Sequence, residues 1–344
     1  MIYKIYMKQL LYFSFFIFMF SNCQRGPKAD EAVDQKADSL SKQLNSPALK
    51  AVNAELLKEP SNPDLYNKRA QVYLSLKQLN EAGNDAKRAI QLDSSKADYF
   101  LTMVDVYYAQ NNTRLAKDLL VLTGNKFPEN TEALLKLSEL YFLVRQYQKG
   151  IDYVNKALKI DEHIAKAYYI KGSIYRESGD TAKAISSLET AVEQDNRFTD
   201  AFYDLGVLYA ARKNPIAFDY YKNVLQINPN NFEARYARAK LMQDLGKIDD
   251  AITEYAALLK INVACEICHY NLGALYLEFK KDNQKALEEF TKAIQIKPDY
   301  IEAYFARAYT YTKLKDKLSA KADYQMCLKI QPDYDAAAEA LNGL

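Results

Sequence analysis

Residues 199–231 read TDAFYDLGVLYAARKNPIAFDYYKNVLQINPNN, and they set the architecture of the whole chain. Apolar residues recur in this stretch at helical spacing, first through Phe202, Leu205 and Tyr209 and then around Tyr221, with no strand-like alternation. Pro229 ends the second run, because proline cannot continue a helix. The stretch therefore predicts two helices that form a hairpin.

The tyrosine of this stretch recurs along the chain. Successive intervals of 34, 34, 34, 34, 33, 34 and 35 residues connect Tyr73, Tyr107, Tyr141, Tyr175, Tyr209, Met242, Tyr276 and Tyr311. Three places before each of them stands a smaller residue, which lets two helices approach closely: Ala70, Val104, Ser138, Gly172, Gly206, Ala239, Gly273 and Ala308. Such a period is typical of stacked helical hairpins, none of which can bury its apolar face alone.

These copies resemble the tetratricopeptide repeat, whose signature is W-x2-L-G-x2-Y, then A-x3-F, then P. Two copies match it best: Phe202, Leu205, Gly206, Tyr209, Ala217, Tyr221 and Pro229, and then His269, Leu272, Gly273, Tyr276, Ala286, Phe290 and Pro298. The resemblance implies an all-α fold, a right-handed α-α superhelix (solenoid) of about eight hairpins. The eight repeats are framed as 63–96, 97–130, 131–164, 165–198, 199–231, 232–265, 266–300 and 301–334. An irregular helical bundle is the alternative, and eight copies in register argue against it.

Composition excludes several classes of function. The 344 residues carry 46 basic and 44 acidic side chains, and no basic stripe that would gather nucleic acid stands out. Two histidines leave little room for a general base, and the chain has no phosphate-binding loop and no metalloprotease or serine-nucleophile motif. We therefore expect no enzyme activity, no cofactor and no small-molecule substrate.

The N-terminus has the three-part pattern of an export signal. Lys4 and Lys8 precede an apolar run over residues 10–20, which is too short to span a bilayer. Cys23 follows, and it resembles the acylated cysteine of bacterial lipoproteins, although Phe20 and Asn22 depart from that family's cleavage pattern. We predict a signal peptide over 1–22 and an exported lipoprotein anchored through Cys23. Gln24 favours the outer membrane of a gram-negative bacterium. An ordinary signal peptide is the alternative.

Two further segments flank the repeats. Residues 23–46 are polar and predict a tether to the membrane. Residues 47–62 predict a capping helix with Leu49, Val52, Leu56 and Leu57 on one side. A short helix is expected over 335–344.

Residues 265–269 spell C-x-x-C-H, the attachment pattern for c-type haem. The repeat register favours another interpretation, because Cys268 takes the place of small packing residues and His269 the place of large aromatic ones. We expect a possible disulfide between Cys265 and Cys268, with a haem or redox carrier as a remote alternative. A metal site is not expected, since His163 lies too far along the stack to complete one.

In the tetratricopeptide repeat family the first helix of each repeat lines a concave groove. The fifth residue of the repeat is aromatic in the last five repeats, where it is Tyr169, Tyr203, Tyr236, Tyr270 and Phe305. We call this row of rings the aromatic ladder. Rings of this kind suit a groove that binds peptides or proteins. Its predicted lining is Leu101, Asp105, Tyr108, Leu135, Glu139, Phe142, Tyr169, Arg176, Tyr203, Tyr236, Lys240, Tyr270, Phe305 and Tyr309. The alternative is that these rings pack against adjoining helices and are largely hidden.

The sequence thus predicts a non-catalytic adaptor of the bacterial cell envelope. It would bind a protein or peptide partner in the groove. Its N-terminal lipid would anchor it to the membrane. We do not expect it to bind nucleic acid. The alternative is a structural subunit of an envelope secretion or assembly machine that uses its convex face or its ends.

Overall fold

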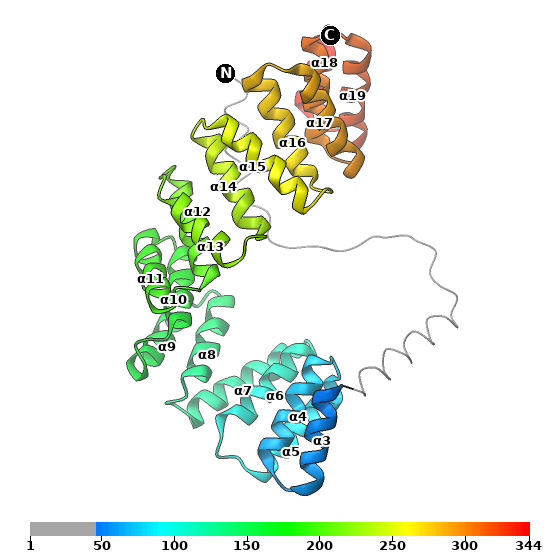
Figure 1. Ribbon diagram of the computed structural model, residues 1–344. Helices are drawn as coiled ribbons and strands as arrows, with labels where there is room; N and C mark the ends of the chain where they lie inside the picture. Colours follow the sequence, from blue (N-terminus) through cyan, green and yellow to red (C-terminus); the bar gives the residue numbers. More distant parts are fainter. Residues whose placement is uncertain (1–45) are drawn as a thin grey trace, which may run out of the picture. The chain divides into compact units, whose positions relative to one another are not determined.

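The computed structural model describes residues 46–344, and every regular element in that range is a helix (Figure 1). The predicted all-α fold of stacked hairpins is confirmed. The predicted signal peptide, the lipidation site Cys23 and the tether up to residue 45 lie outside the described range. Between residues 46 and 344, no helix combines the length and the apolar character needed to cross a membrane.

The chain divides into an N-terminal body that ends at Ala116 and a C-terminal body, Lys117–Leu344. The N-terminal body contains α3 (Pro47–Lys58), α4 (Pro63–Ser75), α5 (Leu79–Leu92), α6 (Ala97–Ala109) and the start of α7 (Thr113–Lys126). Helix α3 packs on α4 and buries Leu49, Val52 and Leu56. Leu57, predicted on the same side, is 86% exposed, because one further residue turns the helix by about 100° away from that side.

The C-terminal body continues the same alternation of first and second helices. Its helices after α7 are α8 (Thr131–Leu143), α9 (Tyr147–Ile160), α10 (Ala165–Glu177), α11 (Thr181–Gln194), α12 (Thr199–Ala211), α13 (Ala217–Ile227), α14 (Phe232–Asp244), α15 (Ile248–Ile261), α16 (Glu266–Leu275), the π-helix η1 (Tyr276–Lys280), α17 (Asn283–Ile296), α18 (Ile301–Lys313), α19 (Lys317–Ile330) and α20 (Asp335–Asn342). Consecutive helices pair as hairpins (Figure 1).

The buried clusters of the C-terminal body join neighbouring hairpins, and the last one joins α18 and α19 to the terminal helix α20. One cluster joins Leu134 of α8 and Val154 of α9 to Ile174 of α10. Another joins Tyr221 of α13 to Leu241 of α14. A hairpin therefore leaves part of its apolar face open until the next hairpin covers it, as its repeat period requires.

Every hairpin turns through one residue in the left-handed conformation. These residues are Lys77, Asn111, Arg145, Gly179, Lys213, Gly246, Lys281 and Lys315. In this conformation an L-residue costs about 1–2 kcal/mol and glycine does not, yet only two of the eight are glycine. Five are Lys or Arg, whose charge is favourable at a helix C-terminus.

The two irregular intervals of the tyrosine column both fall at hairpin turns. The interval of 35 contains η1, a π-helix that takes up one extra residue before the turn at Lys281. The interval of 33 contains the turn after Lys213, where Pro215 stands and α13 begins only at Ala217. The seam between neighbouring hairpins therefore keeps its register.

Glycine at the small-residue column lets a ring lie against the first helix. A methyl group added at Gly206 would stand 2.5 Å from the Tyr221 ring, and one at Gly273 would stand 2.6 Å from the Phe290 ring. Both rings are buried and cannot swing away. At Gly83 in α5 an added methyl would meet only Val106, at an ordinary 3.5 Å.

We expect Gly206→Ala to lower the free energy of unfolding by about 1–3 kcal/mol, because the methyl group overpacks a closed core. Gly83→Ala is the matched control, and it should raise that free energy by about 0.5–1 kcal/mol, since alanine favours the helix. Urea unfolding followed by circular dichroism measures both. Equal effects at the two positions would contradict the close helix approach at Gly206.

Candidate groove in the C-terminal body

First helices form the inner layer of the C-terminal body. Each second helix contacts its own first helix and the first helix of the next hairpin. First helices of neighbouring hairpins also contact one another, as α8 does with α10 and α12 with α14. The resemblance to the tetratricopeptide repeat predicts the groove on this layer, where its candidate lining helices are α8, α10, α12, α14, α16 and α18.

The aromatic ladder predicted on these helices packs against the protein itself. From Tyr203 onward, each fifth-place ring contacts a buried ring on the second helix of its own hairpin. Ring centroids are 6.1 Å apart for Tyr203 and Tyr221, 5.9 Å for Tyr236 and Tyr255, 5.8 Å for Tyr270 and Phe290, and 5.5 Å for Phe305 and Tyr324. One side of each ladder ring is therefore part of the core.

The ladder rings are half-buried rather than hidden. Burial raises the pKa of Tyr203 and of Tyr236, and the hydroxyl of Tyr236 accepts a hydrogen bond of 3.1 Å from the Nδ2 group of Asn271. The rings thus stabilise the hairpins and keep part of their surface accessible, and their contact with a partner stays a prediction.

Two predicted groove residues are core residues, and the prediction is corrected. Leu101 is 2% exposed and Leu135 is 6% exposed, so a partner has almost no surface to contact there. Aliphatic side chains at the fifth place are short enough to sink between the two helices of the hairpin. Asp105 and Tyr108 lie on α6 in the N-terminal body.

The other predicted groove residues belong to the C-terminal body. Phe142 contacts Tyr147 at 6.3 Å between ring centroids. Tyr309 is 44% exposed, with the ammonium of Lys313 4.8 Å from its ring centroid.

The predicted polar residues of this body form local ion pairs. Glu139 pairs with Lys166 at 3.0 Å, and Lys240 pairs with Asp244 one turn away at 3.3 Å. Arg176 on α10 holds the Asp204 carboxylate of α12 at 2.7 Å. Burial raises the pKa of Asp204, and the nearby positive charge of Arg176 only partly opposes this shift.

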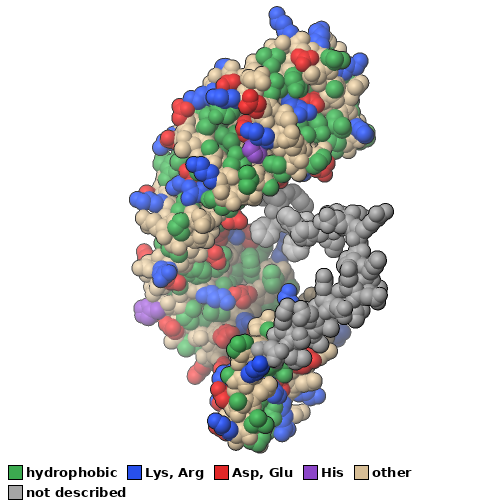
Figure 2. Space-filling view, turned by 45° about the vertical axis from the view of Figure 1, so that its right-hand side comes forward, with side chains coloured by type: hydrophobic (Ala, Val, Ile, Leu, Met, Phe, Trp, Pro, Cys, Tyr) green, Lys and Arg blue, Asp and Glu red, His purple; other side chains and the backbone are tan. Residues whose placement is uncertain are grey.

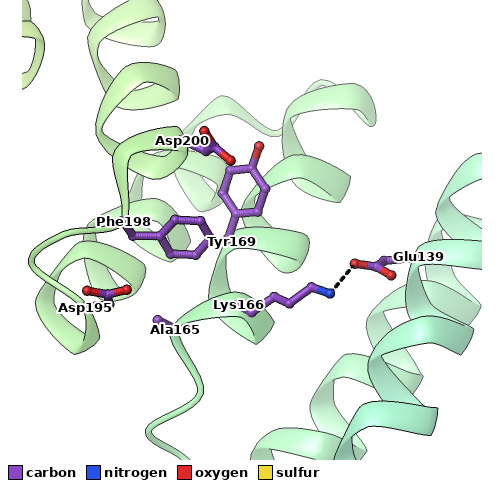
Figure 3. Close-up of a pocket in the computed structure, with 7 residues that line it drawn as sticks. All are labelled: Glu139, Ala165, Lys166, Tyr169, Asp195, Phe198 and Asp200. Carbon is purple, nitrogen blue, oxygen red and sulfur yellow. Dashed lines mark ion pairs between the residues drawn. The ribbon is translucent and has the colours of Figure 1, made fainter. Parts of the chain in front are cut away.

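Between α8, α10 and the start of α12 lies a hollow of about 380 Å³ (Figure 3). Its lining is Glu139, Ala165, Lys166, Tyr169, Asp195, Phe198 and Asp200. Sequence reasoning found Tyr169 and Glu139 and missed the others. Asp200 was visible as one of the acidic residues that begin first helices, where a carboxylate stabilises the helix dipole.

The Tyr169 and Phe198 rings form the wall of this hollow, with centroids 4.9 Å apart and ring planes tilted by 45°. Burial raises the pKa of Tyr169 to about 12, and the negative charges of Asp204 and Asp200 add to the shift. The phenol therefore stays neutral at physiological pH, in a negative electrostatic environment.

Basic and acidic side chains are interspersed over the face shown in Figure 2, with apolar side chains between them. This pattern agrees with the near-balance of 46 basic and 44 acidic residues. The visible face presents no continuous field of one sign that would suit nucleic acid.

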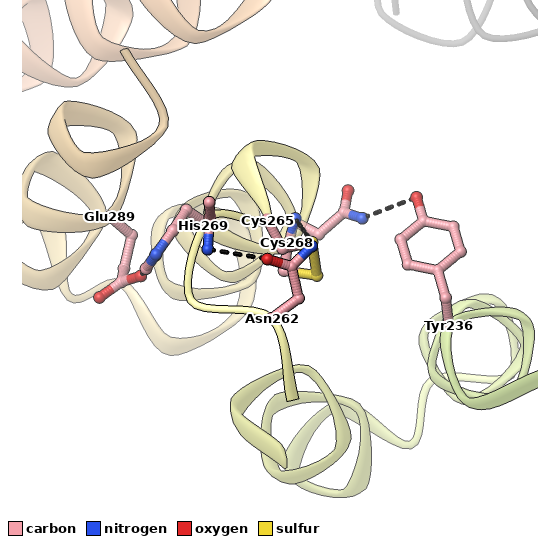
Figure 4. The surroundings of a disulfide bond; sticks show 8 residues. Tyr236, Asn262, Cys265, Cys268, His269 and Glu289 are labelled. Carbon is pink, nitrogen blue, oxygen red and sulfur yellow. Dashed lines mark hydrogen bonds and ion pairs between the residues drawn. A yellow bond between two sulfur atoms is a disulfide. The ribbon is translucent and has the colours of Figure 1, made fainter. Parts of the chain in front are cut away.

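Cys265 and Cys268 form a disulfide at the start of α16 (Figure 4). Both are buried, and the backbone N–H of Cys268 donates to the Cys265 sulfur at 3.1 Å. A thioether linkage to haem needs both sulfurs, and here each is bonded to the other. Nothing in this site favours the haem alternative.

His269 follows the disulfide and is 8% exposed, with its Nδ1 atom 2.6 Å from the Glu289 carboxylate (Figure 4). Burial of Glu289 opposes its ionisation, but hydrogen bonds from His269 and Lys292 outweigh this effect and lower its pKa. The histidine is thus a polar residue satisfied within the core. Among residues 46–344, no group of three or more metal-binding side chains gathers.

Comparison with protein-family models identifies repeats over most of the described range. Models described as "Tetratricopeptide repeat" match residues 63–96, 131–164, 268–300 and 301–334, and also 217–270. A model described as "TPR repeat" matches residues 172–212. Together the matches cover more than half of the chain.

Two curated proteins illustrate the similarity. The chain is 27% identical to BBSome complex member BBS4 of Bos taurus, over 56% of this chain and 44% of that protein. It is 24% identical to DnaJ homolog subfamily C member 3 of Rattus norvegicus, over 85% of this chain and 62% of that protein. The chain thus spans less than two thirds of either relative.

Two solved structures share the fold. A tetratricopeptide repeat protein from Parabacteroides merdae superposes with a TM-score of 0.51 at 19% identity, covering 72% of this chain and 98% of that one. The Pseudomonas aeruginosa protein pilF gives a TM-score of 0.52 at 16% identity, covering 64% and 97%. At such identities the likeness concerns the fold alone.

The disulfide yields a test that needs no partner. We expect the tryptic peptide 261–280 of protein purified without reductant to resist alkylation and to be lighter by two hydrogen atoms, because Cys265 and Cys268 are joined. Peptide mass spectrometry measures both properties. The peptide that contains the buried, free Cys327 serves as the control and should be alkylated after denaturation. Two alkylated cysteines in 261–280 would contradict the bond.

Proposed function

This chain belongs to the tetratricopeptide repeat family, and from that premise we propose that it is a non-catalytic scaffold that holds a partner protein or peptide against the first helices of its C-terminal body. The observation that carries the proposal is the half-buried aromatic ladder on that layer. Its rings are fixed by packing on one side, so they offer contact area to a partner at little cost in side-chain entropy.

The inner layer also offers varied chemistry along its length. Val207 of α12 is 36% exposed, Lys240 of α14 carries a positive charge, and the hollow beside Tyr169 carries carboxylates. A layer of this kind suits an extended segment that contacts several repeats in turn. This is the expected use of a stack whose neighbours repeat at a fixed spacing.

We further propose that the scaffold works in the bacterial cell envelope, anchored through a lipid on Cys23. The support is the order of the leader, in which Lys4 and Lys8 precede the apolar run that ends before Cys23. Several acyl chains on one cysteine hold a protein to a bilayer more firmly than the marginal hold of a single chain. Gln24 supports delivery to the outer membrane.

The groove is tested with two matched pairs of substitutions in the full chain. The inner variant combines Val207→Glu with Lys240→Glu on first helices, and the outer variant combines Leu318→Glu with Lys222→Glu on second helices. All four side chains are at least partly exposed, so both variants should keep the helical content of the wild type. We expect the inner variant alone to lose the partner.

The measurement is in vivo crosslinking in the native envelope, followed by affinity purification and mass spectrometry. The wild type and the outer variant should yield the same crosslinked species, and the inner variant should yield less than about one tenth of it, since an uncompensated buried charge costs several kcal/mol. Loss in the outer variant alone would favour the structural subunit, which assembles through its convex face.

The anchor is tested by Cys23→Ser. We expect this variant to leave the membrane fraction and to lose the incorporation of a labelled fatty acid, because no other acylation site is proposed. Gln24→Ser serves as the control and should retain the lipid. A Cys23→Ser protein that still sediments with membranes would exclude lipid anchoring at this residue.

A further inference from the structure

The hollow beside Tyr169 differs from the rest of the inner layer in its charge. Three carboxylates line it, those of Glu139, Asp195 and Asp200, against the single ammonium of Lys166. Arg176 lies close by, but its guanidinium is committed to Asp204 at 2.7 Å. The hollow is therefore net negative, and a positively charged group would gain energy by entering it.

The position of the carboxylates leaves room for a guest. Asp195 caps the end of α11 and Asp200 lies in the first turn of α12, and both are exposed at the rim of the hollow. Figure 3 shows Asp200 beside the Tyr169 hydroxyl and Asp195 on the other side of Phe198. Both carboxylates thus flank the aromatic wall.

The aromatic wall adds a second attraction for the same kind of guest. Ring faces carry partial negative charge, and a cation within about 6 Å of a ring centroid is attracted to it. The Tyr169 and Phe198 rings are held 4.9 Å apart by their packing, so they need no reordering when a guest arrives. A planar guanidinium suits this site better than an ammonium, because it stacks on rings and bonds two carboxylate oxygens at once.

The chain already places one cation in the hollow. Lys166 reaches from α10 to Glu139 on α8 at 3.0 Å, and the two side chains are 56% and 38% exposed (Figure 3). An exposed pair of this kind contributes little to stability and is readily exchanged. The Glu139 carboxylate can therefore exchange its ion pair with Lys166 for one with an incoming cation at a small cost in free energy.

We propose that this hollow is the specificity pocket of the groove and that it binds an arginine side chain from an extended segment of the partner. The proposal rests on the proposed function, since the segment has to lie along the first helices. The Tyr169 and Phe198 rings stack on the guanidinium, and Asp195 and Asp200 bond its N–H groups. An acidic segment is repelled, and an apolar side chain would strip water from the carboxylates without replacing their hydrogen bonds.

The test detects peptide binding at the aromatic wall of the hollow. Phe198→4-fluorophenylalanine in the otherwise intact chain gives a single fluorine resonance on the aromatic wall. The probes are the capped peptide Gly-Ser-Arg-Ser-Gly and matched peptides with glutamine or glutamate at the centre. We expect the arginine peptide alone to shift the resonance in a saturable manner, with an affinity that falls as salt is added.

A variant pair then assigns the charges. Asp195→Asn with Asp200→Asn should weaken the arginine peptide by at least about tenfold, because charge-assisted hydrogen bonds are lost. Glu302→Gln is the matched control: Glu302 holds the place of Asp200 in α18, beside the Tyr270–Tyr300 ring pair, and its loss should leave the resonance shift unchanged. Thermal unfolding of each variant checks that the fold is kept.

The outcomes separate this inference from the proposed function. If the glutamine peptide shifts the resonance as the arginine peptide does, or if the double variant binds arginine as tightly as the wild type, the arginine pocket is refuted. Partner crosslinking that still depends on Val207 and Lys240 would then leave the groove function standing. If arginine binds as expected but the inner variant keeps its crosslinks, the arginine site stands, and both the groove function and the role of the site in partner specificity fall.

Discussion

A hairpin of this chain cannot cover its own apolar face, and the rest of the structure depends on that constraint. Leu134 and Val154 belong to one hairpin, yet their cluster is closed only by Ile170 and Ile174 of the next. Because each hairpin needs a neighbour in the same register, the period has to be kept throughout. The inner layer of first helices follows from that register, and it is the layer on which we propose that the partner binds.

Much of the fold could be predicted from the sequence because the constraint is local and repeated. The tyrosine column and the small residues before it report the same packing event in repeat after repeat, and prolines end four of the eight repeats, so chance agreement in one place does not mislead. The burial of Cys268 could be predicted in the same way, since small buried residues occupy its position in most of the other repeats. Leu57 was misjudged because only one further residue turned it out of the core of α3.

The candidate site was harder to predict, because its residues come from three repeats and from helices that meet only after folding. Tyr169 and Phe198 lie in the same repeat, 165–198, but α11 separates them in the sequence, and only the folded chain brings their rings to 4.9 Å. The pairs between first and second helices were missed for a similar reason. Arg69 bonds Asp85 and Arg307 bonds Asp323 at the same separation of 16 residues, a spacing that has no meaning until the hairpin is closed. Likewise, the sequence could not tell which side of each ladder ring is covered.

The turns of the hairpins tolerate changes in length that the seams do not. An added residue is taken up as a π-helical turn before Lys281, and a missing one is absorbed near Pro215, while the packing between neighbours is unchanged on either side. The tips are thus natural attachment points for a fluorophore or an epitope tag. A reporter grafted there would leave the layer of first helices intact and would show where the molecule resides in a living cell.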